Sequence, residues 1–335
     1  MNTPRLRWGI LGTGMIAEKF AHGLALSETG IPAAVASRSI ESAEAFLDRL
    51  RIDEETARSY DATEAVAGYE NLLAHPDLDA IYIALPNHLH REWTLAALRA
   101  GKHVLCEKPL ALDTEEATEL FAAAEDANRV LIEAFMYRTL PQTARILELV
   151  REGKLGDLRI IRANFTFERE ASRDDARYQP ENGGGSLMDV GCYCIDFARS
   201  LAGTEPAEGS AVFHEHEYGV DDYAAGVLRF PNDIVLSFTC GMTVTSDQTT
   251  HIAGTKGRIE IPRFWFGREG VTLVRPNEDP ETIVEPSEGL DSVYAVEADA
   301  FASVVGGGPN WNPPENTIAN MKVLDSLRAA AAWVT

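Results

Sequence analysis

Positive charge and long apolar segments are scarce in this sequence. Its 30 Lys and Arg residues stand against 52 Asp and Glu residues, which gives a formal net charge of −22. A chain with this charge is repelled by the phosphate backbone of nucleic acids and by anionic membrane surfaces. No window approaches the ~18 uncharged apolar residues that a membrane-spanning helix needs. We therefore expect neither a nucleic acid nor a membrane as a partner.

Cysteine is also scarce. The four cysteines are Cys106, Cys192, Cys194 and Cys240, and their spacing does not repeat as the ligands of a zinc site would. We expect no metal, and reduced thiols in a cytoplasmic protein. The first predicted strand begins within a few residues of Met1, so we also expect no signal peptide.

The length of 335 residues predicts two domains. In the first part of the chain, predicted strands and helices alternate, which is typical of a parallel, doubly wound sheet. After Gly156 several strands follow one another without that alternation, which indicates a largely antiparallel sheet. We expect an α/β protein with a dinucleotide-binding Rossmann domain over residues 1–128. An α+β domain for substrate binding and oligomerisation is expected over residues 129–335.

A glycine-rich turn follows the first predicted strand. Residues 12–17 have the pattern G-x-G-x-x-A, and helical spacing of apolar residues comes next. The chemistry needs glycine because the backbone must approach a pyrophosphate held at the start of the helix. The alternative is a plain glycine-rich turn. The position between strand and helix favours dinucleotide binding by Gly12, Thr13, Gly14, Met15 and Ile16.

The second predicted strand ends at Ser37-Arg38-Ser39. NAD-binding sites carry an acidic residue there for the ribose 2′-hydroxyl. An Arg between two hydroxyls can instead bind a 2′-phosphate. We therefore favour NADP(H), with Ser37 and Arg38 among its ligands, and leave NAD(H) open. The alternative is that Arg38 is only a surface charge.

Two further predicted strands end in polar motifs. One ends at Leu85, followed by Pro86, Asn87 and His90, and the other ends at Glu107-Lys108-Pro109. The carboxyl ends of parallel strands border the crevice in which such sheets bind ligands. These residues are therefore expected to line the cofactor side of the site. Lys108 is the candidate catalytic residue, and the alternative is a solvated Lys at an ordinary turn.

A triple glycine, Gly183 to Gly185, introduces a predicted helix in the second half of the chain. Asp189 and Tyr193 are four residues apart in it, so they share one helical face. A carboxylate and a phenol on one face form a plausible clamp for a substrate. The alternative is an amphipathic core helix.

Taken together, these motifs resemble the family of glucose–fructose oxidoreductases, inositol dehydrogenases and rhizopine catabolism proteins across nearly the whole chain. Tyr193 stands where the inositol-dehydrogenase type has His. With Glu133 to Arg138, it is similar to the branch of NADP-dependent D-xylose dehydrogenase and dimeric dihydrodiol dehydrogenase. The resemblance implies that Lys108 and Tyr193 form the catalytic pair. It also implies that Asp189, Arg138 and Tyr137 contact substrate.

The resemblance implies a cis Lys108–Pro109 bond and a homodimer or higher homo-oligomer in which a second subunit covers the antiparallel sheet. One departure matters. Many relatives have Phe-His-Pro after Arg138, whereas this chain has Thr139-Leu140-Pro141. One imidazole of the substrate region is therefore missing.

The function that follows is a dehydrogenase acting on CH–OH groups. It would transfer a hydride between a nicotinamide cofactor and a hydroxyl of a sugar, polyol or diol. One alternative is a reductase of an anhydro-ketose or another sugar carbonyl, which would use the same residues. An alternative of another class is a non-catalytic, nucleotide-sensing regulator, against which the presence of both Lys108 and Tyr193 argues.

Overall fold

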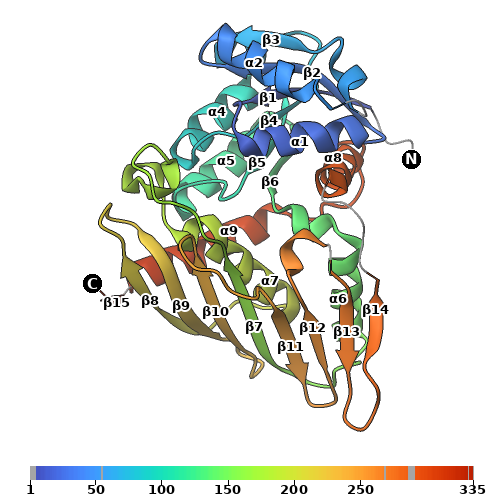
Figure 1. Ribbon diagram of the computed structural model, residues 1–335, viewed down its shortest axis with the longest axis vertical. Coiled ribbons are helices and arrows are strands. Elements are labelled where there is room, and N and C mark those ends of the chain that lie inside the picture. Colours follow the sequence, from blue (N-terminus) through green and yellow to red (C-terminus); the bar gives the residue numbers. More distant parts are fainter. Residues whose placement is uncertain (1–4, 54–55, 268, 286–290, 331, 335) are drawn as a thin grey trace. The chain divides into compact units, whose positions relative to one another are not determined.

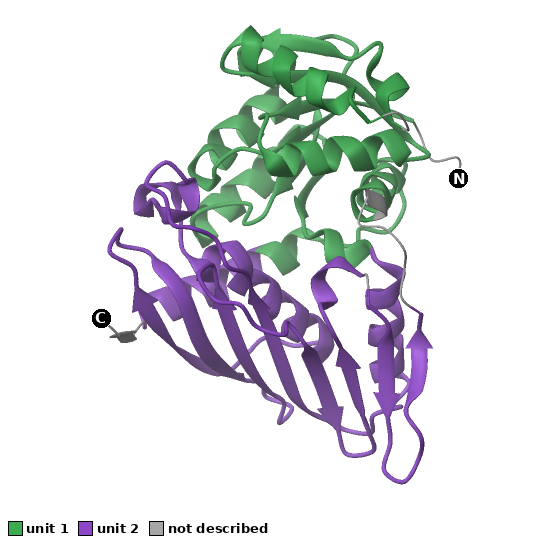
Figure 2. Cartoon of the chain, viewed as in Figure 1, with its two compact units in different colours: residues 1–139, 291–317 green, residues 140–290, 318–335 purple. Residues whose placement is uncertain are grey.

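The computed structural model describes residues 5–53, 56–267, 269–285, 291–330 and 332–334. The chain forms two compact units, shown in different colours in Figure 2. The first comprises residues 1–139 and 291–317, and the second comprises residues 140–290 and 318–335. The division differs from the predicted boundary after residue 128, because the chain leaves the first sheet later and returns to the first unit near its end.

The first unit is built on a six-stranded sheet in the order β3-β2-β1-β4-β5-β6 (Figure 1), and all neighbouring strands are parallel. This is the predicted doubly wound sheet, and it is confirmed. Its elements are β1 (Leu6–Leu11), α1 (Met15–Leu26), β2 (Gly30–Ser37), α2 (Ile40–Leu50), η1 (Ala57–Tyr60), β3 (Glu64–Ala67), α3 (Tyr69–Leu73), β4 (Ala80–Ile83), α4 (Asn87–Arg99), β5 (His103–Glu107), α5 (Thr114–Asp126), β6 (Leu131–Ala134), η2 (Met136–Thr139) and α8 (Asp291–Val305).

Local chemistry explains where these elements begin. The central strands are continuous apolar segments because helices cover both faces of a parallel sheet, and all four residues of β4 are buried. Asp113 caps α5, since its side chain accepts the backbone N–H of Glu116 at 2.9 Å. The carboxylate of Glu116 accepts the N–H of Leu112 at 3.0 Å. These two bonds fix the start of α5 between β5 and β6.

Helix α8 belongs to the first unit although it comes late in the sequence. It packs against α1, where a Cβ at Gly23 would lie 2.4 Å from Cβ of Tyr294. Only glycine therefore lets the two helices approach this closely. At the start of β2, Asp299 of α8 accepts hydrogen bonds from the hydroxyls of Ser27 and Thr29.

The second unit contains a nine-stranded sheet in the order β14-β13-β12-β11-β7-β10-β9-β8-β15. Strand β10 is parallel to β7, and β15 is parallel to β8; the other neighbouring pairs among the described strands are antiparallel. The predicted, largely antiparallel sheet is confirmed. The elements are α6 (Pro141–Arg151), β7 (Leu158–Thr166), η3 (Ala176–Tyr178), η4 (Pro180–Asn182), η5 (Leu187–Gly191), α7 (Cys192–Ala202), β8 (Glu208–Glu215), β9 (Asp221–Arg229), β10 (Val235–Gly241), β11 (Thr250–Gly254), β12 (Arg258–Ile261), η6 (Phe264–Phe266), β13 (Val271–Val274), β14 (Glu281–Val284) and β15 (Ala332–Val334), with α9 (Pro314–Ala329) crossing from the first unit.

The two faces of this sheet differ in what covers them. Helix α7 packs on β7 and β10, and Figure 1 shows α6 and α7 on the same side of the sheet. The strand register places Val212, Val227 and Val235 on the other face, where each side chain is 40–48% exposed. An exposed apolar row of this kind is what the predicted subunit contact would cover.

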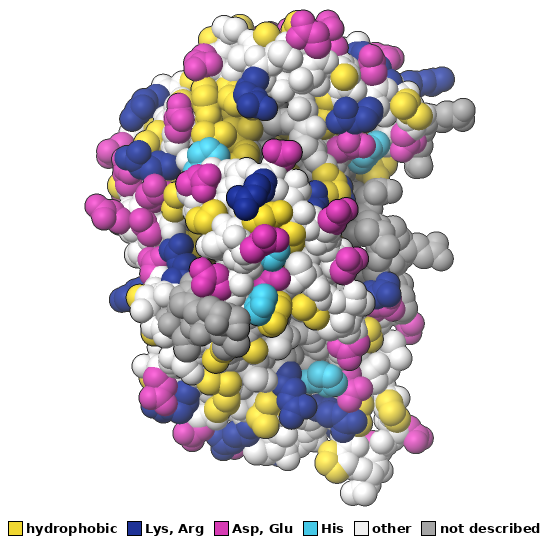
Figure 3. All heavy atoms as spheres, turned by 60° about the vertical axis from the view of Figure 1, so that its left-hand side comes forward, with side chains coloured by type: hydrophobic (Ala, Val, Ile, Leu, Met, Phe, Trp, Pro, Cys, Tyr) yellow, Lys and Arg dark blue, Asp and Glu magenta, His cyan; other side chains and the backbone are white. Residues whose placement is uncertain are grey.

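Acidic and basic side chains are interspersed over the face shown in Figure 3. The excess of acid therefore does not form one large negative field on that face. Along the described residues, the structure has no helix that is both long and apolar enough to cross a membrane.

Candidate active site

The turn after β1 contains the predicted pyrophosphate-binding residues. Gly12 has a φ of +104°, and a Cβ there would lie 2.6 Å from the carbonyl oxygen of Ala84. Gly14 is the exposed N-cap of α1, where a Cβ would meet nothing within 4 Å. Met15 is 55% exposed and Ile16 is half-buried. The first N–H groups of α1 thus lie beside bare backbone, the arrangement that binds a pyrophosphate.

The end of β2 lies next to this turn. The hydroxyls of Thr13 and Ser37 are 3.4 Å apart, and Ser37 is buried. Arg38 is exposed, and Ser39 caps α2. Burial raises the pKa of Tyr69, and the positive charge of Arg38 acts in the opposite direction. The predicted contact of Arg38 with a 2′-phosphate stays a prediction.

His90 connects the two motif loops that follow β4 and β5. It is fully buried, its Nε2 lies 2.8 Å from the carbonyl oxygen of Leu85, and its Nδ1 lies 2.8 Å from that of Pro109. Burial lowers its pKa to about 4, although the two carbonyls act in the opposite direction. Pro86 and Asn87 are half-buried at the start of α4. The geometry gives His90 a positioning role, and its predicted contact with the cofactor stays a prediction.

Glu107 is the last residue of β5 and is buried, while Lys108 is half-buried. The backbone N–H of Lys108 donates to Glu107 Oε2 at 3.3 Å, and the hydroxyl of Tyr82 donates to Glu107 Oε1. The Lys108–Pro109 bond is cis, which confirms what the resemblance implied. Lys108 therefore lies at the carboxyl end of a central strand, as the sequence predicted.

A buried acidic cluster adjoins this strand end, and the sequence did not predict it. Glu297 of α8 is fully buried, and no described residue forms a hydrogen bond with either of its carboxyl oxygens. Burial, with the charge of Glu107, raises the pKa of Glu297 well above its usual range. Burial and the same two carboxyls also raise the pKa values of Tyr82 and Tyr294. Glu297 is therefore a buried carboxyl whose pKa depends on the charge of Glu107, the residue that precedes Lys108.

The segment after β6 contains two of the predicted substrate residues. Tyr137 is fully buried, and its ring lies edge-on to Phe135 at 6.1 Å between centroids. Arg138 is half-buried, and its Nε donates to the carbonyl oxygen of Trp311 at 3.2 Å. Both side chains thus have packing or bonding roles within the first unit, and their substrate contacts stay predictions.

In the second unit, the helix after the triple glycine begins as a π-helical turn, η5, and continues as α7. Such turns inside helices are frequent at functional sites. Asp189 lies in η5, and Tyr193 is the second residue of α7. The Tyr193 ring is 4% exposed and lies edge-on to Phe165 at 5.2 Å and to Trp265 at 5.6 Å. Aromatic packing therefore fixes the direction of its phenol.

The carboxylate of Asp189 is held by a residue that sequence reasoning missed. Arg177 of η3 donates from Nε to Asp189 Oδ2 at 3.0 Å and from Nη1 to Asp175 Oδ1 at 3.3 Å. Asp189, and with it Asp175, raises the pKa of the Arg177 guanidinium. Asp189, which is predicted to contact the substrate, is therefore one end of a network of charged side chains.

Asp221, the first residue of β9, anchors the start of η5. Its Oδ2 accepts the hydroxyl of Ser186 and the backbone N–H of Leu187, each at 2.7 Å. Burial raises its pKa to about 6, although these two donors act in the opposite direction. The space for this carboxylate exists because residue 185 is glycine: a Cβ on Gly185 would lie 2.1 Å from Asp221 Oδ1.

The cysteines and acids form no metal site that the described residues reveal. All four cysteines are free and buried. Along the described parts of the chain, no three His, Cys, Asp or Glu side chains gather as a metal ion would require.

Comparison with known proteins shows which family has this arrangement. A family model described as an oxidoreductase family with an NAD-binding Rossmann fold matches residues 6–135. A second model, described as the GFO/IDH/MocA C-terminal domain, matches residues 143–260. The chain belongs to the Gfo/Idh/MocA oxidoreductase family. The predicted resemblance is thereby confirmed, and the protein is an oxidoreductase with an NAD-binding Rossmann fold.

Relatives agree with the predicted branch of the Gfo/Idh/MocA family. D-xylose 1-dehydrogenase (NADP(+)) 2 of Haloferax volcanii is 34% identical, over 97% of this chain and 97% of the relative. Trans-1,2-dihydrobenzene-1,2-diol dehydrogenase of Mus musculus is 34% identical, over 83% of this chain and 81% of the relative. The crystal structure of KijD10, a 3-ketoreductase from Actinomadura kijaniata in complex with NADP and TDP-benzene, has a TM-score of 0.85 at 31% identity, covering 99% of both chains.

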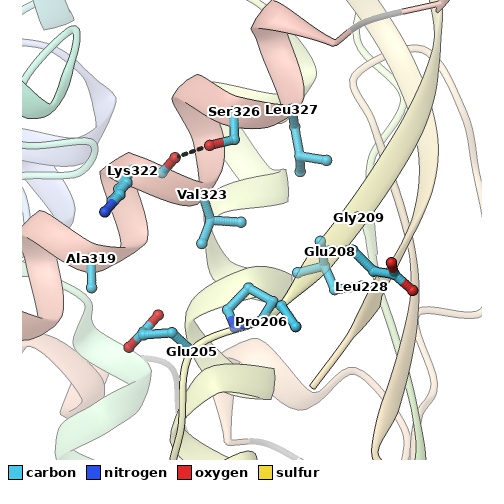
Figure 4. A pocket seen from close by; sticks show the side chains of 11 residues that line it. Glu205, Pro206, Glu208, Gly209, Leu228, Ala319, Lys322, Val323, Ser326 and Leu327 are labelled. Carbon is cyan, nitrogen blue, oxygen red and sulfur yellow. Dashed lines mark hydrogen bonds between the residues drawn. The ribbon is translucent and has the colours of Figure 1, made fainter. Parts of the chain in front are cut away.

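This member of the Gfo/Idh/MocA family also has a pocket that is separate from the predicted site residues. Figure 4 shows Val323 and Leu327 of α9 turned toward the segment that contains Pro206. Glu205 and Lys322 supply opposite charges to the lining. The Glu205 carboxylate already binds Arg199, at 2.6 Å and 2.7 Å. No residue that the sequence predicts for the active site lines this pocket.

Proposed function

We propose that this family member is an NADP-dependent dehydrogenase of a sugar, polyol or diol hydroxyl, and that Lys108 and Tyr193 are its catalytic residues. The single observation that carries the proposal is Lys108 at the carboxyl end of β5, directly after the buried Glu107. The pairing with Tyr193 rests on the sequence motifs. Crystal structures have been solved of KijD10 variants in which a lysine or a tyrosine is replaced, which supports roles for the same residue types in this chain.

The cofactor side of the proposal rests on the first unit. Residues 12–16 would hold the pyrophosphate, since Gly12 and Gly14 leave the backbone bare at the start of α1. Ser37 and Arg38 would hold a 2′-phosphate, and both a relative and a solved neighbour are named with NADP. The bound nicotinamide would supply the hydride chemistry. The protein itself supplies position and charge.

The two catalytic side chains have distinct roles in the proposal. A free tyrosine has a pKa of ~10, and a neighbouring ammonium favours its phenolate. Tyr193 would accept the hydroxyl proton of the substrate on its phenol oxygen, and return it in the reverse direction. The ammonium of Lys108 would stabilise both the phenolate and the developing alkoxide. The ring packing of Tyr193 against Phe165 and Trp265 holds the phenol ready for this transfer.

The substrate class is taken from the relatives, whose names give D-xylose and a dihydrodiol. A reductase of a sugar carbonyl stays a second candidate, because a neighbour is named as a ketoreductase. We also propose a homodimer that covers the exposed face of the second sheet. The cytoplasmic location stays a prediction.

The test is a screen of sugars, polyols and diols with NADP⁺ and NAD⁺, followed by Tyr193→Phe and Lys108→Met. We expect Tyr193→Phe to lower turnover about 10²- to 10⁴-fold, the range of general acid–base catalysis, with little change in cofactor affinity. The Phe ring keeps the packing, so melting temperature serves as the control. Near-normal turnover of Tyr193→Phe, with an unchanged pH profile, would show that another group moves the proton. No turnover by the wild type in either direction would favour the nucleotide-sensing alternative.

A further inference from the structure

Four charged side chains of the second unit alternate in sign and end at Asp189. Arg169 Nε lies 2.9 Å from Asp175 Oδ2, Asp175 Oδ1 accepts a hydrogen bond from Arg177, and Arg177 Nε donates to Asp189 Oδ2 at 3.0 Å. The side chains of Asp175 and Asp189 are 11% and 14% exposed, whereas that of Arg177 is 37% exposed. The guanidinium of Arg177 is therefore the accessible group next to Asp189, while Arg169, which is 40% exposed, lies at the far end of the network.

The triple glycine holds the backbone of Arg177 in place. The N–H of Gly185 donates to the carbonyl oxygen of Arg177 at 2.9 Å. A Cβ on Gly184 would lie 2.4 Å from the same oxygen. Any side chain at residue 184 would push η3 away and carry the guanidinium off Asp189. The triple glycine thus provides the close approach that its pattern predicted, and the group that approaches is Arg177.

The charges of the network cancel. The guanidinium groups of Arg169 and Arg177 balance the carboxylates of Asp175 and Asp189, so these four groups by themselves offer an anionic group on a substrate no net attraction, and the Asp189 carboxylate repels it. A hydroxyl faces no such penalty. It can donate to a carboxylate oxygen, and a neighbouring hydroxyl can accept from a guanidinium, which has more N–H donors than its two bonds to Asp175 and Asp189 use.

We propose that Arg177 is a specificity-determining residue that acts with Asp189 to bind two adjacent hydroxyls of an uncharged sugar or polyol. Asp189 accepts a hydrogen bond from one hydroxyl, and Arg177 donates to the other. The inference rests on the proposed function and deepens it, because it assigns a second residue to substrate binding and restricts the substrate to neutral vicinal diols.

The experiment compares Arg177→Gln with the wild type on matched substrates and NADP⁺. The pair is a neutral sugar that the wild type oxidises and its deoxy analogue, which lacks the hydroxyl next to the reacting carbon. We expect Arg177→Gln to raise KM for the complete sugar on the order of 10- to 100-fold, the loss of a hydrogen bond to a charged group, with kcat changed only a few-fold. KM for the deoxy analogue should change little, so the variant should no longer distinguish the complete sugar from its deoxy analogue as the wild type does.

Two further variants separate binding from folding. Arg159→Gln removes an exposed arginine of the second unit that pairs with Asp157 and Asp233, outside the network, and it should keep the wild-type KM. Arg177→Lys keeps the positive charge beside Asp189 but not the planar fork, and it should fold as the wild type yet keep a raised KM.

Equal losses on both substrates, a loss confined to kcat, or full rescue by Arg177→Lys would overturn the inference. So would a wild type that prefers a matched sugar acid over the neutral sugar, an outcome that leaves the dehydrogenase function intact. A wild type that turns over no sugar, polyol or diol refutes the proposed function itself and this inference with it.

Discussion

Replacing Asp221 by Asn should stabilise the protein at alkaline pH and leave its stability nearly unchanged in acid. Asp221 is 8% exposed, and its carboxylate accepts the hydroxyl of Ser186 and the N–H of Leu187. Burial outweighs these two donors and raises its pKa from 3.8 to about 6. Asn has nearly the same shape and retains an acceptor oxygen, but it carries no charge.

The magnitude follows from the shift in pKa. The folded protein binds the proton of Asp221 more tightly than the unfolded chain does. The contribution to the free energy of unfolding is therefore complete below pH 3.8 and is lost as the pH rises through about 6. A shift of roughly two units corresponds to about 3 kcal/mol. Because Asn cannot ionise, Asp221→Asn should match the wild type at acid pH and exceed it by up to about 3 kcal/mol at about pH 8.

Urea unfolding at acid and alkaline pH measures the difference, and amide hydrogen exchange of residues 187–202 assigns it to the second unit. The matched control is Asp48→Asn, whose side chain is 76% exposed, so that it removes the same charge from the surface. The control should show no comparable gain. A loss of stability in Asp221→Asn at alkaline pH would refute the reasoning, because the two hydrogen bonds would then outweigh the cost of burying the charge.

The remaining predictions concern cofactor choice and assembly. Arg38→Ala should weaken NADP binding by roughly 1.5 to 3 kcal/mol, as expected for charge-assisted hydrogen bonds, with NAD nearly unchanged; equal losses in titration calorimetry would remove Arg38 from the 2′-phosphate. Light scattering at micromolar concentration should show at least a homodimer, and Val227→Asp, a charge on the exposed sheet face, should shift it toward monomer. A wild-type monomer, or a variant that assembles normally, would contradict that assignment.

Most of the first unit could be predicted because its signals are local. A strand, a glycine turn and a helix are adjacent in the sequence at Gly12, and the polar motif ending in Lys108 directly follows its buried strand. Helix α8 could not be placed in this way. Its contact with α1 depends on the absence of a side chain at Gly23, opposite Tyr294, and no local pattern links residues so far apart.

The candidate site was predictable for the residues that motifs carry, such as Asp189 and Tyr193. Arg177 and Asp221 were missed because each lies in a polar stretch without a motif and acts through a contact made in three dimensions. The triple glycine was the one local signal for these two residues. The interpretation that the glycines allow close approach was correct, but it does not reveal which groups approach.

The two missed residues give the triple glycine a more specific meaning than flexibility. Gly184 leaves room for the carbonyl of Arg177, and Gly185 leaves room for the carboxylate of Asp221. The first contact sets the guanidinium against Asp189, and the second anchors the turn from which Asp189 and the helix of Tyr193 continue. Burial raises the pKa of Asp221, and its carboxylate holds the turn through its bonds to Ser186 and Leu187. Adjacent glycines therefore provide space for two groups: the backbone carbonyl of Arg177, whose side chain bonds to Asp189, and the carboxylate of Asp221, which anchors the start of the helix.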